Sequence, residues 1–325
     1  MPDPISGHTV FVTGAAGFIG SHTVERLLER GAKVVGVDNF DPYYPRKLKE
    51  RNIEEIRVRG GSFEFIEGDI CDHDLMSAVF ERVKPRGVIH LAAKAGVRPS
   101  IEDPVGYANA NVTGTAVTLN CAHVAGCDRI VVASSSSVYG NSRDVPFRET
   151  QDVNEPISPY AASKRSCEII AHAHHHLTKM PTALLRFFTV FGPRQRPDLA
   201  IEKFLRKVNA GENIDMFGDG STSRDYTFVD DIVTGVLASY ERIPEFGYRV
   251  WNLGGSHPTT LRDMIDTISR VVGKPANTVT KPMQPGDVDR TWADLSRSGS
   301  ELGFKPTTNF ESGVRQQWAW IVKHG

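Results

Sequence analysis

A tyrosine and a lysine four residues apart are the part of this sequence best suited to chemistry. Tyr160 and Lys164 follow Ser158 and Pro159, which suit the N-cap and the first position of a helix. Residues i and i+4 lie on one face of a helix, so the lysine ammonium would stand about 5 Å from the phenol. That charge favours the phenolate by roughly 3 kcal/mol at an effective dielectric of about 20. We therefore predict that Tyr160 acts as a general base on a substrate hydroxyl group.

A glycine-rich turn, Gly14-Ala-Ala-Gly17-Phe-Ile-Gly20, indicates phosphate binding. The first glycine permits a tight turn, the second lets a pyrophosphate approach the backbone, and the third lets helix and strand pack closely. The helix that follows presents free N–H groups and a partial positive charge to the phosphates. Asp38 lies 18 residues after Gly20, where a carboxylate would accept hydrogen bonds from the adenosine ribose and repel a 2′-phosphate. The sequence therefore predicts an NAD site rather than an NADP site.

Alternating strands and helices would position both sets of residues. Between the first two strand-like runs lies a helical segment, residues 20–30, with Val24, Leu27 and Leu28 on the same face as Ile19. Repeated strand–helix–strand units imply a parallel sheet covered by helices on both faces. We therefore predict an α/β fold of the Rossmann type, with a doubly wound parallel sheet. The strand-like runs are residues 8–13, 33–38, 63–66, 87–91 and 129–133.

The sequence changes in character after about residue 190. Glycine, proline and polar residues become denser, residues 258–273 form one clear helical segment, and a loop follows over residues 281–286. A strand-like run at residues 249–253 can rejoin the main sheet. We therefore predict an NAD-binding domain over residues 1–189, with about 225–257 returning to it, and a smaller mixed α/β substrate-binding domain over 190–224 and 258–325.

The composition of the 325-residue chain is that of an ordinary globular protein. Apolar residues make up 40% and charged residues 24%, which excludes a disordered chain and a disulfide miniprotein. Lys plus Arg is 38 against 39 for Asp plus Glu, a net charge of −1. Such a balance argues against a surface for nucleic acid or an anionic membrane. It is compatible with a small anionic ligand, because a few local arginines can hold one.

The cysteines and the start of the chain indicate a cytoplasmic protein. Residues 1–6 lack the basic and apolar regions of a signal peptide. No apolar stretch approaches the ~18 residues needed to span a bilayer. Without a CxxC pair, reduced thiols are expected at the four cysteines, Cys71, Cys121, Cys127 and Cys167.

Several motifs together resemble one family along nearly the whole chain. They are Thr13-Gly-Ala-Ala-Gly-Phe-Ile-Gly20, His90-Leu-Ala-Ala93, Ser134-Ser-Ser-Ser-Val-Tyr-Gly140, Tyr160-Ala-Ala-Ser-Lys164, the run from Arg186 to Asp198, Phe217-Gly-Asp-Gly220, Arg224 to Asp231 and Gln284-Pro-Gly-Asp287. This set resembles the extended short-chain dehydrogenase/reductase family of nucleotide-sugar enzymes. Within that family it is most similar to the 4-epimerases of UDP-hexuronates, which interconvert UDP-glucuronate and UDP-galacturonate.

The resemblance implies a redox-neutral reaction with tightly bound NAD. Tyr160 would take the proton of the sugar 4-hydroxyl while the C4 hydrogen passes to NAD, Ser135 would bond to the same oxygen, and Lys164 would hold the nicotinamide ribose. The 4-keto sugar would then rotate and take the hydrogen back on its other face. The implied cofactor contacts are Gly14, Gly17, Phe18, Ile19, Gly20, Asp38, Asn39, Asp69, Ile70, Leu91, Ala92, Ala93, Lys94 and Asn109, with Tyr160 and Lys164.

Two positions separate the related activities. Nucleotide-sugar 4,6-dehydratases carry an Asp-Glu pair just before the position of Val138, because eliminating water needs its own acid and base. UDP-xylose-forming decarboxylases usually carry a Glu there. This sequence has Ser136 and Ser137, so dehydration is not expected and decarboxylation is disfavoured. UDP-glucose 4-epimerases commonly have Asn followed by Pro where this chain has Thr189 and Val190.

The hydroxyls of Ser136, Ser137 and Thr189 suggest how a sugar carboxylate would be held. A 4-keto uronate is a β-keto acid that loses CO₂ readily. Hydrogen bonds that fix the carboxylate near the ring plane would keep the breaking C–C bond away from overlap with the carbonyl. For the UDP part, the planar guanidinium of arginine suits phosphate oxygens. The expected substrate contacts are Arg98, Ser136, Ser137, Thr189, Arg196, Phe217, Arg224, Asp287 and Arg290.

A histidine-rich segment on the same helix as Tyr160 has two interpretations. His172 and His176 are spaced i, i+4 as in some metal sites, but no third ligand is suggested, so we expect no metal. In the family this helix and the one around residues 111–125 usually pair with their copies. We therefore expect a homodimer, and no nucleic acid or membrane partner.

Other functions remain open at this point. A 4-epimerase of UDP-glucose or UDP-N-acetylglucosamine and, less favoured, a UDP-glucuronate decarboxylase share these motifs. A reductase that releases NADH would differ by net reduction of added NAD. A non-catalytic NAD-binding regulator could use the same fold. That last reading is disfavoured because both Tyr160 and Lys164 are present.

Overall fold

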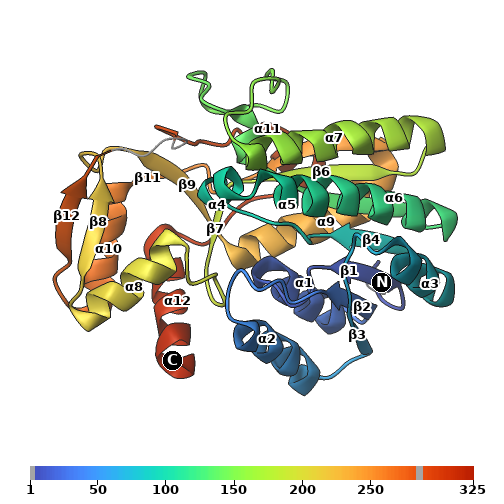
Figure 1. Cartoon of the computed structure of the whole chain (residues 1–325), viewed down its shortest axis with the longest axis horizontal. Coiled ribbons are helices and arrows are strands. Elements are labelled where there is room, and N and C mark those ends of the chain that lie inside the picture. Colours follow the sequence, from blue (N-terminus) through green and yellow to red (C-terminus); the bar gives the residue numbers. More distant parts are fainter. Residues whose placement is uncertain (1–3, 283–287) are drawn as a thin grey trace.

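The computed structural model describes residues 4–282 and 288–325. Its centre is a parallel sheet in the order β10-β6-β5-β4-β1-β2-β3 (Figure 1). Because β1 lies between β2 and β4, the chain reverses direction across the sheet there, and this switch point is where open α/β sheets bind ligands. The strands are β1 (Thr9–Thr13), β2 (Lys33–Asp38), β3 (Phe63–Glu67), β4 (Gly87–His90), β5 (Arg129–Ser135), β6 (Thr182–Phe187) and β10 (Tyr248–Leu253).

Helices cover both faces of this sheet. One face carries α1 (Phe18–Glu29), α2 (Arg46–Arg59) and α9 (Val229–Phe246), with α11 (Ser296–Leu302) against α9 and β10. The other carries α3 (His73–Val83), α6 (Gly114–Val124) and α7 (Pro159–Thr178). Shorter pieces join them, namely α4 (Val97–Glu102), α5 (Pro104–Ala108), the π-helical turn η1 (Asn109–Thr113) and the 3₁₀ turn η2 (Ser136–Tyr139). The architecture is the predicted Rossmann-like α/β fold.

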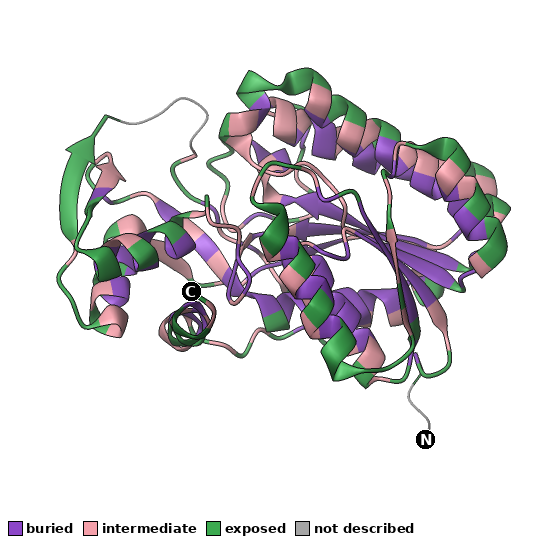
Figure 2. Ribbon diagram, turned by 60° about the horizontal axis from the view of Figure 1, so that its bottom comes forward, coloured by how far each residue is buried: buried purple, intermediate pink, exposed green. Residues whose placement is uncertain are grey.

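The sheet is buried on both faces, which explains the near-continuous β-branched runs in its strands. All seven residues of β5 are buried, and Figure 2 shows the central strands as the buried layer between half-buried helices. Two apolar clusters result, one under α1 and α9 and one under α3, α6 and α7. The β1 residue Thr13 pairs with Val37 in β2 and His90 in β4. This register brings Gly14, Asp38 and Leu91 to one edge of the sheet.

A smaller lobe follows β6. A three-stranded sheet joins β7 (Thr189–Phe191), β9 (Ser223–Phe228) and β11 (Pro258–Thr260), and β8 (Asn213–Phe217) pairs with β12 (Asn277–Lys281). Helices α8 (Ala200–Ala210), α10 (Leu261–Val272) and α12 (Phe310–His324) pack together beside these strands (Figure 1). The apolar cluster under α9 continues into α8 and α10 without a break, so the division into two domains at the residues given above stays a prediction.

The predicted elements agree with the structure except at one helix. The segment expected to be helical over residues 258–273 begins instead with β11, and α10 starts at Leu261. The reason is local, because the Thr260 hydroxyl accepts a hydrogen bond from Asp263 N at 3.0 Å and caps the helix there. Of the loop predicted at 281–286, Lys281 closes β12, and residues 283–286 lie outside the described part. Within the described ranges, no helix is long and apolar enough to cross a membrane.

Candidate active site

A cavity of about 630 Å³ opens at the carboxyl ends of β1, β2, β4 and β5. This volume lies in the range of small-molecule and cofactor sites. The cavity collects residues from many separate segments, including most of those predicted to bind the cofactor. The predicted cofactor residues that line it are Gly14, Gly17, Phe18, Ile19, Gly20, Asp38, Asn39, Asp69, Ile70, Leu91, Ala92, Ala93, Lys94, Tyr160 and Lys164.

The glycine turn leaves room only for backbone. Gly14 has φ +71°, and a Cβ added to it would lie 2.8 Å from the Ala92 nitrogen. A Cβ on Gly20 would lie 2.0 Å from the Gly14 oxygen. The turn opens directly into α1, and no side chain caps the first N–H groups of this helix. A surface of bare backbone at a helix N-terminus is the cradle that a dinucleotide pyrophosphate requires.

Asp38 ends β2 beside this turn. Its carboxylate accepts hydrogen bonds from Ala16 N at 3.2 Å and Phe40 N at 2.9 Å. Burial raises the pKa of Asp38, while the Lys49 ammonium opposes that rise. The next residue, Asn39, donates from Nδ2 to Asp69 Oδ2 at 2.8 Å, which adds an amide and a second carboxylate to this part of the site. The segment from Asp38 to Asn39 therefore holds polar groups where the adenosine ribose of a dinucleotide would lie.

A buried histidine fixes the backbone under the cofactor cradle. His90 Nδ1 lies 2.7 Å from Thr13 Oγ1, and its Nε2 lies 3.1 Å from Thr115 Oγ1. Leu91 N and Ala92 N both donate to Thr13 Oγ1, so the threonine hydroxyl must donate to His90 Nδ1. Burial, aided by Lys164, lowers the pKa of His90 to about 3. The imidazole is therefore neutral and acts as a fixed spacer between β1, β4 and α6.

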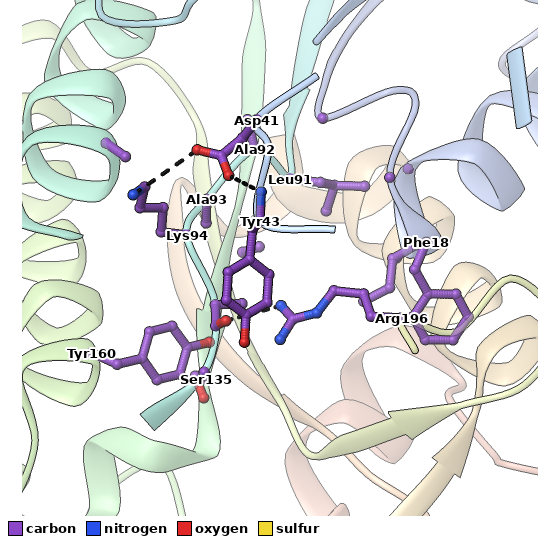
Figure 3. Close-up of a pocket in the computed structure, with 18 of the residues that line it drawn as sticks. Phe18, Asp41, Tyr43, Leu91, Ala92, Ala93, Lys94, Ser135, Tyr160 and Arg196 are labelled. Carbon is purple, nitrogen blue, oxygen red and sulfur yellow. Dashed lines mark hydrogen bonds and ion pairs between the residues drawn. The ribbon is translucent and has the colours of Figure 1, made fainter. Parts of the chain in front are cut away.

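Tyr160, Lys164 and Ser135 meet at the far end of the cavity. Ser158 caps α7 by accepting from Ala161 N at 3.1 Å, which sets the predicted face. The buried Lys164 Nζ donates to Ala133 O at 2.8 Å, and Figure 3 shows Tyr160 pointing its hydroxyl toward the end of β5, where Ser135 lies. Lys164 keeps two further N–H bonds for a bound ligand. The arrangement can hold a hydroxyl-bearing substrate between a phenol and a serine.

A buried ion pair supports this end of β5 from behind. Glu168, one turn after Lys164, accepts from Arg186 Nε at 2.8 Å and Nη2 at 2.9 Å. The same carboxylate accepts from Ser134 Oγ at 2.7 Å. Arg186 lowers the pKa of Glu168 despite its burial, so the carboxylate is ionised at neutral pH. Because Ser134 directly precedes Ser135, the ion pair fixes this end of β5 relative to α7.

The cavity also receives part of the predicted substrate set. Ser136, Thr189 and Arg196 line it. Ser137 lies just behind, with its N–H donated to Ser135 Oγ at 3.1 Å and its own hydroxyl oxygen buried without a partner among the described residues. Hydroxyl groups rather than carboxylates therefore surround the end of β5. Such a surface can hydrogen-bond a sugar without supplying the acid and base of a dehydratase.

The remaining predicted contacts lie outside the cavity lining. Arg98 stands over the Phe217 ring, with its guanidinium carbon 5.0 Å from the ring centre. Arg224 Nη1 donates to Ser223 O at 3.0 Å. In the smaller lobe, the backbone of Arg290 forms an isolated β-bridge with Ser223. Their part in binding stays a prediction. The same holds for Asp287, which lies outside the described residues.

Asn109 is also absent from the lining, and its neighbour Asn111 has the more prominent contacts. Asn111 Oδ1 accepts from Lys94 N at 2.8 Å, and its Nδ2 donates to Lys94 O at 3.0 Å and to Ser163 Oγ at 2.8 Å. This side chain therefore ties the loop after β4 to α7 between Tyr160 and Lys164. It sits in the π-helical turn η1, and such turns are frequent at functional sites.

Sequence reasoning missed a group of residues that follow β2. Asp41, Tyr43, Tyr44 and Lys49 all line the cavity. Lys49 Nζ donates to Asp41 O at 2.9 Å, and burial lowers its pKa. The available signal was the aromatic run Phe40-Asp-Pro-Tyr-Tyr44 close after a strand that ends in Asp38. Loops at the carboxyl ends of parallel strands carry ligand contacts.

The histidine-rich segment points away from this site. His174 makes an edge-on contact with His123 of α6, with ring centres 5.7 Å apart, and burial lowers its pKa. His172 and His175 instead contact the Tyr248 ring. Among the described residues, no group of three His, Cys, Asp or Glu side chains is placed to hold a metal ion.

Comparison with known proteins places this geometry among nucleotide-sugar enzymes. The model of the GDP-mannose 4,6 dehydratase family matches residues 11–317. A probable UDP-glucuronate 4-epimerase of Rhizobium meliloti is 39% identical over 95% of this chain and 95% of its own. UDP-glucuronic acid 4-epimerase of Bacillus cereus, solved in complex with UDP-glucuronic acid and NAD, is 34% identical with a TM-score of 0.90, over 97% of this chain and 99% of its own. UDP-glucose 4-epimerase of Thermotoga maritima, solved with UDP-glucose, is 31% identical with a TM-score of 0.88, over 97% and 99% of the two chains.

Proposed function

This chain belongs to the GDP-mannose 4,6 dehydratase family, and we propose that within it the protein is an NAD-dependent UDP-glucuronate 4-epimerase that forms UDP-galacturonate. The observation that carries this assignment is one cavity that joins a dinucleotide cradle to Tyr160, Lys164 and a wall of hydroxyl groups. The family name covers dehydratases, but Ser136 and Ser137 stand where those enzymes need an acid and a base. The reaction is an isomerisation and consumes no cofactor.

The chain's own groups account for the proton chemistry. NAD, when bound, takes up the hydrogen from the sugar C4 and later returns it. Tyr160 would remove the proton of the 4-hydroxyl, and Ser135 would donate a hydrogen bond to the same oxygen. The fixed ammonium of Lys164 stabilises negative charge on the phenol oxygen, since Ala133 O orients it. After the 4-keto sugar has rotated, Tyr160 would return the proton to the C4 oxygen, which then has the opposite configuration.

The hydroxyl wall favours a uronate. Thr189 and Ser136 can donate hydrogen bonds to a carboxylate on the sugar C6. They carry no positive charge, so the carboxylate is held without being neutralised. We infer that this arrangement keeps the carboxylate out of alignment with the C4 carbonyl and suppresses loss of CO₂.

A substrate panel tests the assignment. The purified protein receives UDP-glucuronate, UDP-glucose or UDP-N-acetylglucosamine in separate reactions, and chromatography resolves the products while released CO₂ is measured. We expect UDP-galacturonate from UDP-glucuronate, with no CO₂ and no net reduction of added NAD. Turnover of UDP-glucose but not UDP-glucuronate would contradict the assignment in favour of the activity named for the Thermotoga relative. Pentose formation with CO₂ would indicate a decarboxylase.

We also propose that the enzyme acts as a homodimer through α6 and α7. Their outer faces expose apolar side chains, with Val124 76%, Ile169 54% and Leu177 80% exposed. Isolated exposed apolar residues are ordinary, but three on adjacent helices suit burial against a second copy. Light scattering after gel filtration should give twice the chain mass, and Ile169→Glu should shift it toward the monomer. We further place the activity in the cytoplasm, where the four cysteines stay reduced.

A further inference from the structure

Two loops from opposite sides of the cavity meet through Tyr43 and Asp198. Arg196 donates from Nε to Asp198 Oδ1 at 3.0 Å and from Nη2 to Oδ2 at 2.7 Å. The Tyr43 hydroxyl donates to Asp198 Oδ2 at 3.2 Å, and the Arg196 guanidinium carbon lies 4.9 Å from the centre of the Tyr43 ring. Arg196 Nη1 also donates to Ala95 O at 2.9 Å, in the loop after β4. We call the contact of Tyr43, Arg196 and Asp198 the clasp.

The clasp is anchored to the segment that carries Asp38. Tyr43 N donates to Asp41 Oδ1 at 2.9 Å, and Lys49 holds the Asp41 carbonyl from α2. Phe40 N in turn donates to Asp38 Oδ1. The position of the Tyr43 ring is therefore set by the same loop that places the carboxylate for the adenosine ribose. Opening the clasp frees this loop from the loop between β7 and α8.

The clasp lies at the rim of the cavity. Tyr43 and Arg196 line it together with Phe18 and Asn39, and Figure 3 shows Tyr43 and Arg196 side by side between Phe18 and Tyr160. Tyr43 is 43% exposed, and the side chains of Arg196 and Asp198 are 14% and 34% exposed. Because Tyr43 and Asp198 are partly exposed to water, the hydrogen bond between them can open at a lower cost than one in the buried core.

We propose that the clasp retains NAD in the site between turnovers, with Tyr43 and Asp198 acting as positioning residues for the loop over the cofactor. The inference rests on the proposed function, because an epimerase must return the hydrogen from the same cofactor molecule that took it. Neither residue touches the reacting atoms of the sugar. Each acts through the loop that it holds.

The rate of NAD release tests this proposal. The full-length protein is loaded with radiolabelled NAD and diluted into excess unlabelled NAD, and the bound label is followed with time. We expect Tyr43→Phe and Asp198→Asn to release the label on the order of tenfold faster than the wild type, as expected for losing a hydrogen bond to a charged group. If the hydroxyl acts through Asp198, the double variant should release NAD no faster than Asp198→Asn alone.

Matched controls separate the clasp from general loosening. Tyr240→Phe removes a buried hydroxyl that has no partner among the described residues and lies near Gly87, at the opposite end of β4 from the cavity. Asp74→Asn changes a fully exposed carboxylate at the start of α3. Both should release NAD at the wild-type rate. Equal unfolding midpoints for all variants would show that the protein remains folded.

Release at the wild-type rate by folded Tyr43→Phe and Asp198→Asn would overturn the proposal. So would a wild-type protein that exchanges its NAD faster than it turns over substrate. The substrate panel described above is independent of this measurement. If UDP-glucuronate is converted but the variants retain NAD, only the clasp is wrong, and if the variants release NAD but nothing is converted, only the assigned activity is wrong.

Discussion

The cofactor side of the cavity and the Arg196–Asp198 pair at its rim hold their polar groups in different ways. On the cofactor side, His90 lies buried between two threonines, and Glu168 and Arg186 form an ion pair hidden behind β5. At the rim, Arg196 pairs with Asp198, and their side chains keep 14% and 34% of their surface exposed. The first region cannot change partners without leaving a buried polar group unpaired, which is costly. The second is partly open to water, so a change of partners there costs less.

This difference suggests a division of work. Hydrogen transfer needs the sugar, Tyr160 and the nicotinamide in one fixed geometry, which the buried networks supply. Binding, rotating and releasing a charged sugar requires side chains that can exchange partners, and the Arg196–Asp198 pair at the rim supplies them. Substitutions on the cofactor side should therefore reduce stability or kcat, and those at the Arg196–Asp198 pair should change binding and release.

The largest effect is expected at the catalytic phenol. Tyr160→Phe should reduce epimerisation by about 10² to 10⁴-fold, because it removes the proposed general base. The NAD content and the unfolding free energy should stay as in the wild type. Kinetic assays with UDP-glucuronate, alongside cofactor analysis, check this expectation. Activity within tenfold of the wild type would mean that another group moves the proton.

Removing the charge of Glu168 tests the buried network on the cofactor side directly. Glu168→Gln leaves Arg186 buried without its partner and should lower the free energy of unfolding by about 3–5 kcal/mol. The matched change Glu245→Gln breaks an exposed pair with Arg242 and should leave urea unfolding unchanged. If both variants unfold at the same urea concentration, the contrast between buried and exposed ion pairs is wrong.

Acid should weaken the buried networks through their neutral histidines. His90 and His22 both have a pKa lowered to about 3 by burial, against 6.5 in the unfolded chain. Their contribution to stability is fully present above pH 6.5 and is lost as pH falls toward 3. At pH 5.5 each histidine should have lost about 1.4 kcal/mol. Urea unfolding between pH 7.5 and 5.5 should show this fall, and His90→Asn should reduce it. An unchanged pH slope in the variant would count against a neutral, buried His90.

The smallest expected effect concerns sugar choice. Thr189→Val keeps the shape of the side chain but removes its hydroxyl. It should either weaken UDP-glucuronate binding five- to tenfold, about 1 to 1.4 kcal/mol, or allow release of a pentose product. KM measurement and product chromatography distinguish the two results. If neither changes, Thr189 does not hold the carboxylate.

The sequence allows prediction where the signals are local. Gly14, Gly17 and Gly20 sit in one turn, and Ser158, Pro159, Tyr160 and Lys164 sit in one helix start, so spacing alone indicates their geometry. The strand β11 was missed because Pro258–Thr260 pairs with β9, more than 30 residues earlier in the chain. The clasp was missed for the same reason, since Tyr43 and Asp198 are 155 residues apart. Contacts between distant loops depend on the packed fold, which no local pattern records.

The fate of the hydrogen at C4 tests the central claim most directly. UDP-glucuronate labelled with deuterium at C4 is incubated in ordinary water with the NAD-loaded protein, and the product is analysed by mass spectrometry and NMR. We predict UDP-galacturonate that retains deuterium at C4, without accumulation of reduced cofactor. Deuterium lost to solvent, or reduced cofactor formed in proportion to product, would contradict an epimerase that takes and returns the same hydrogen.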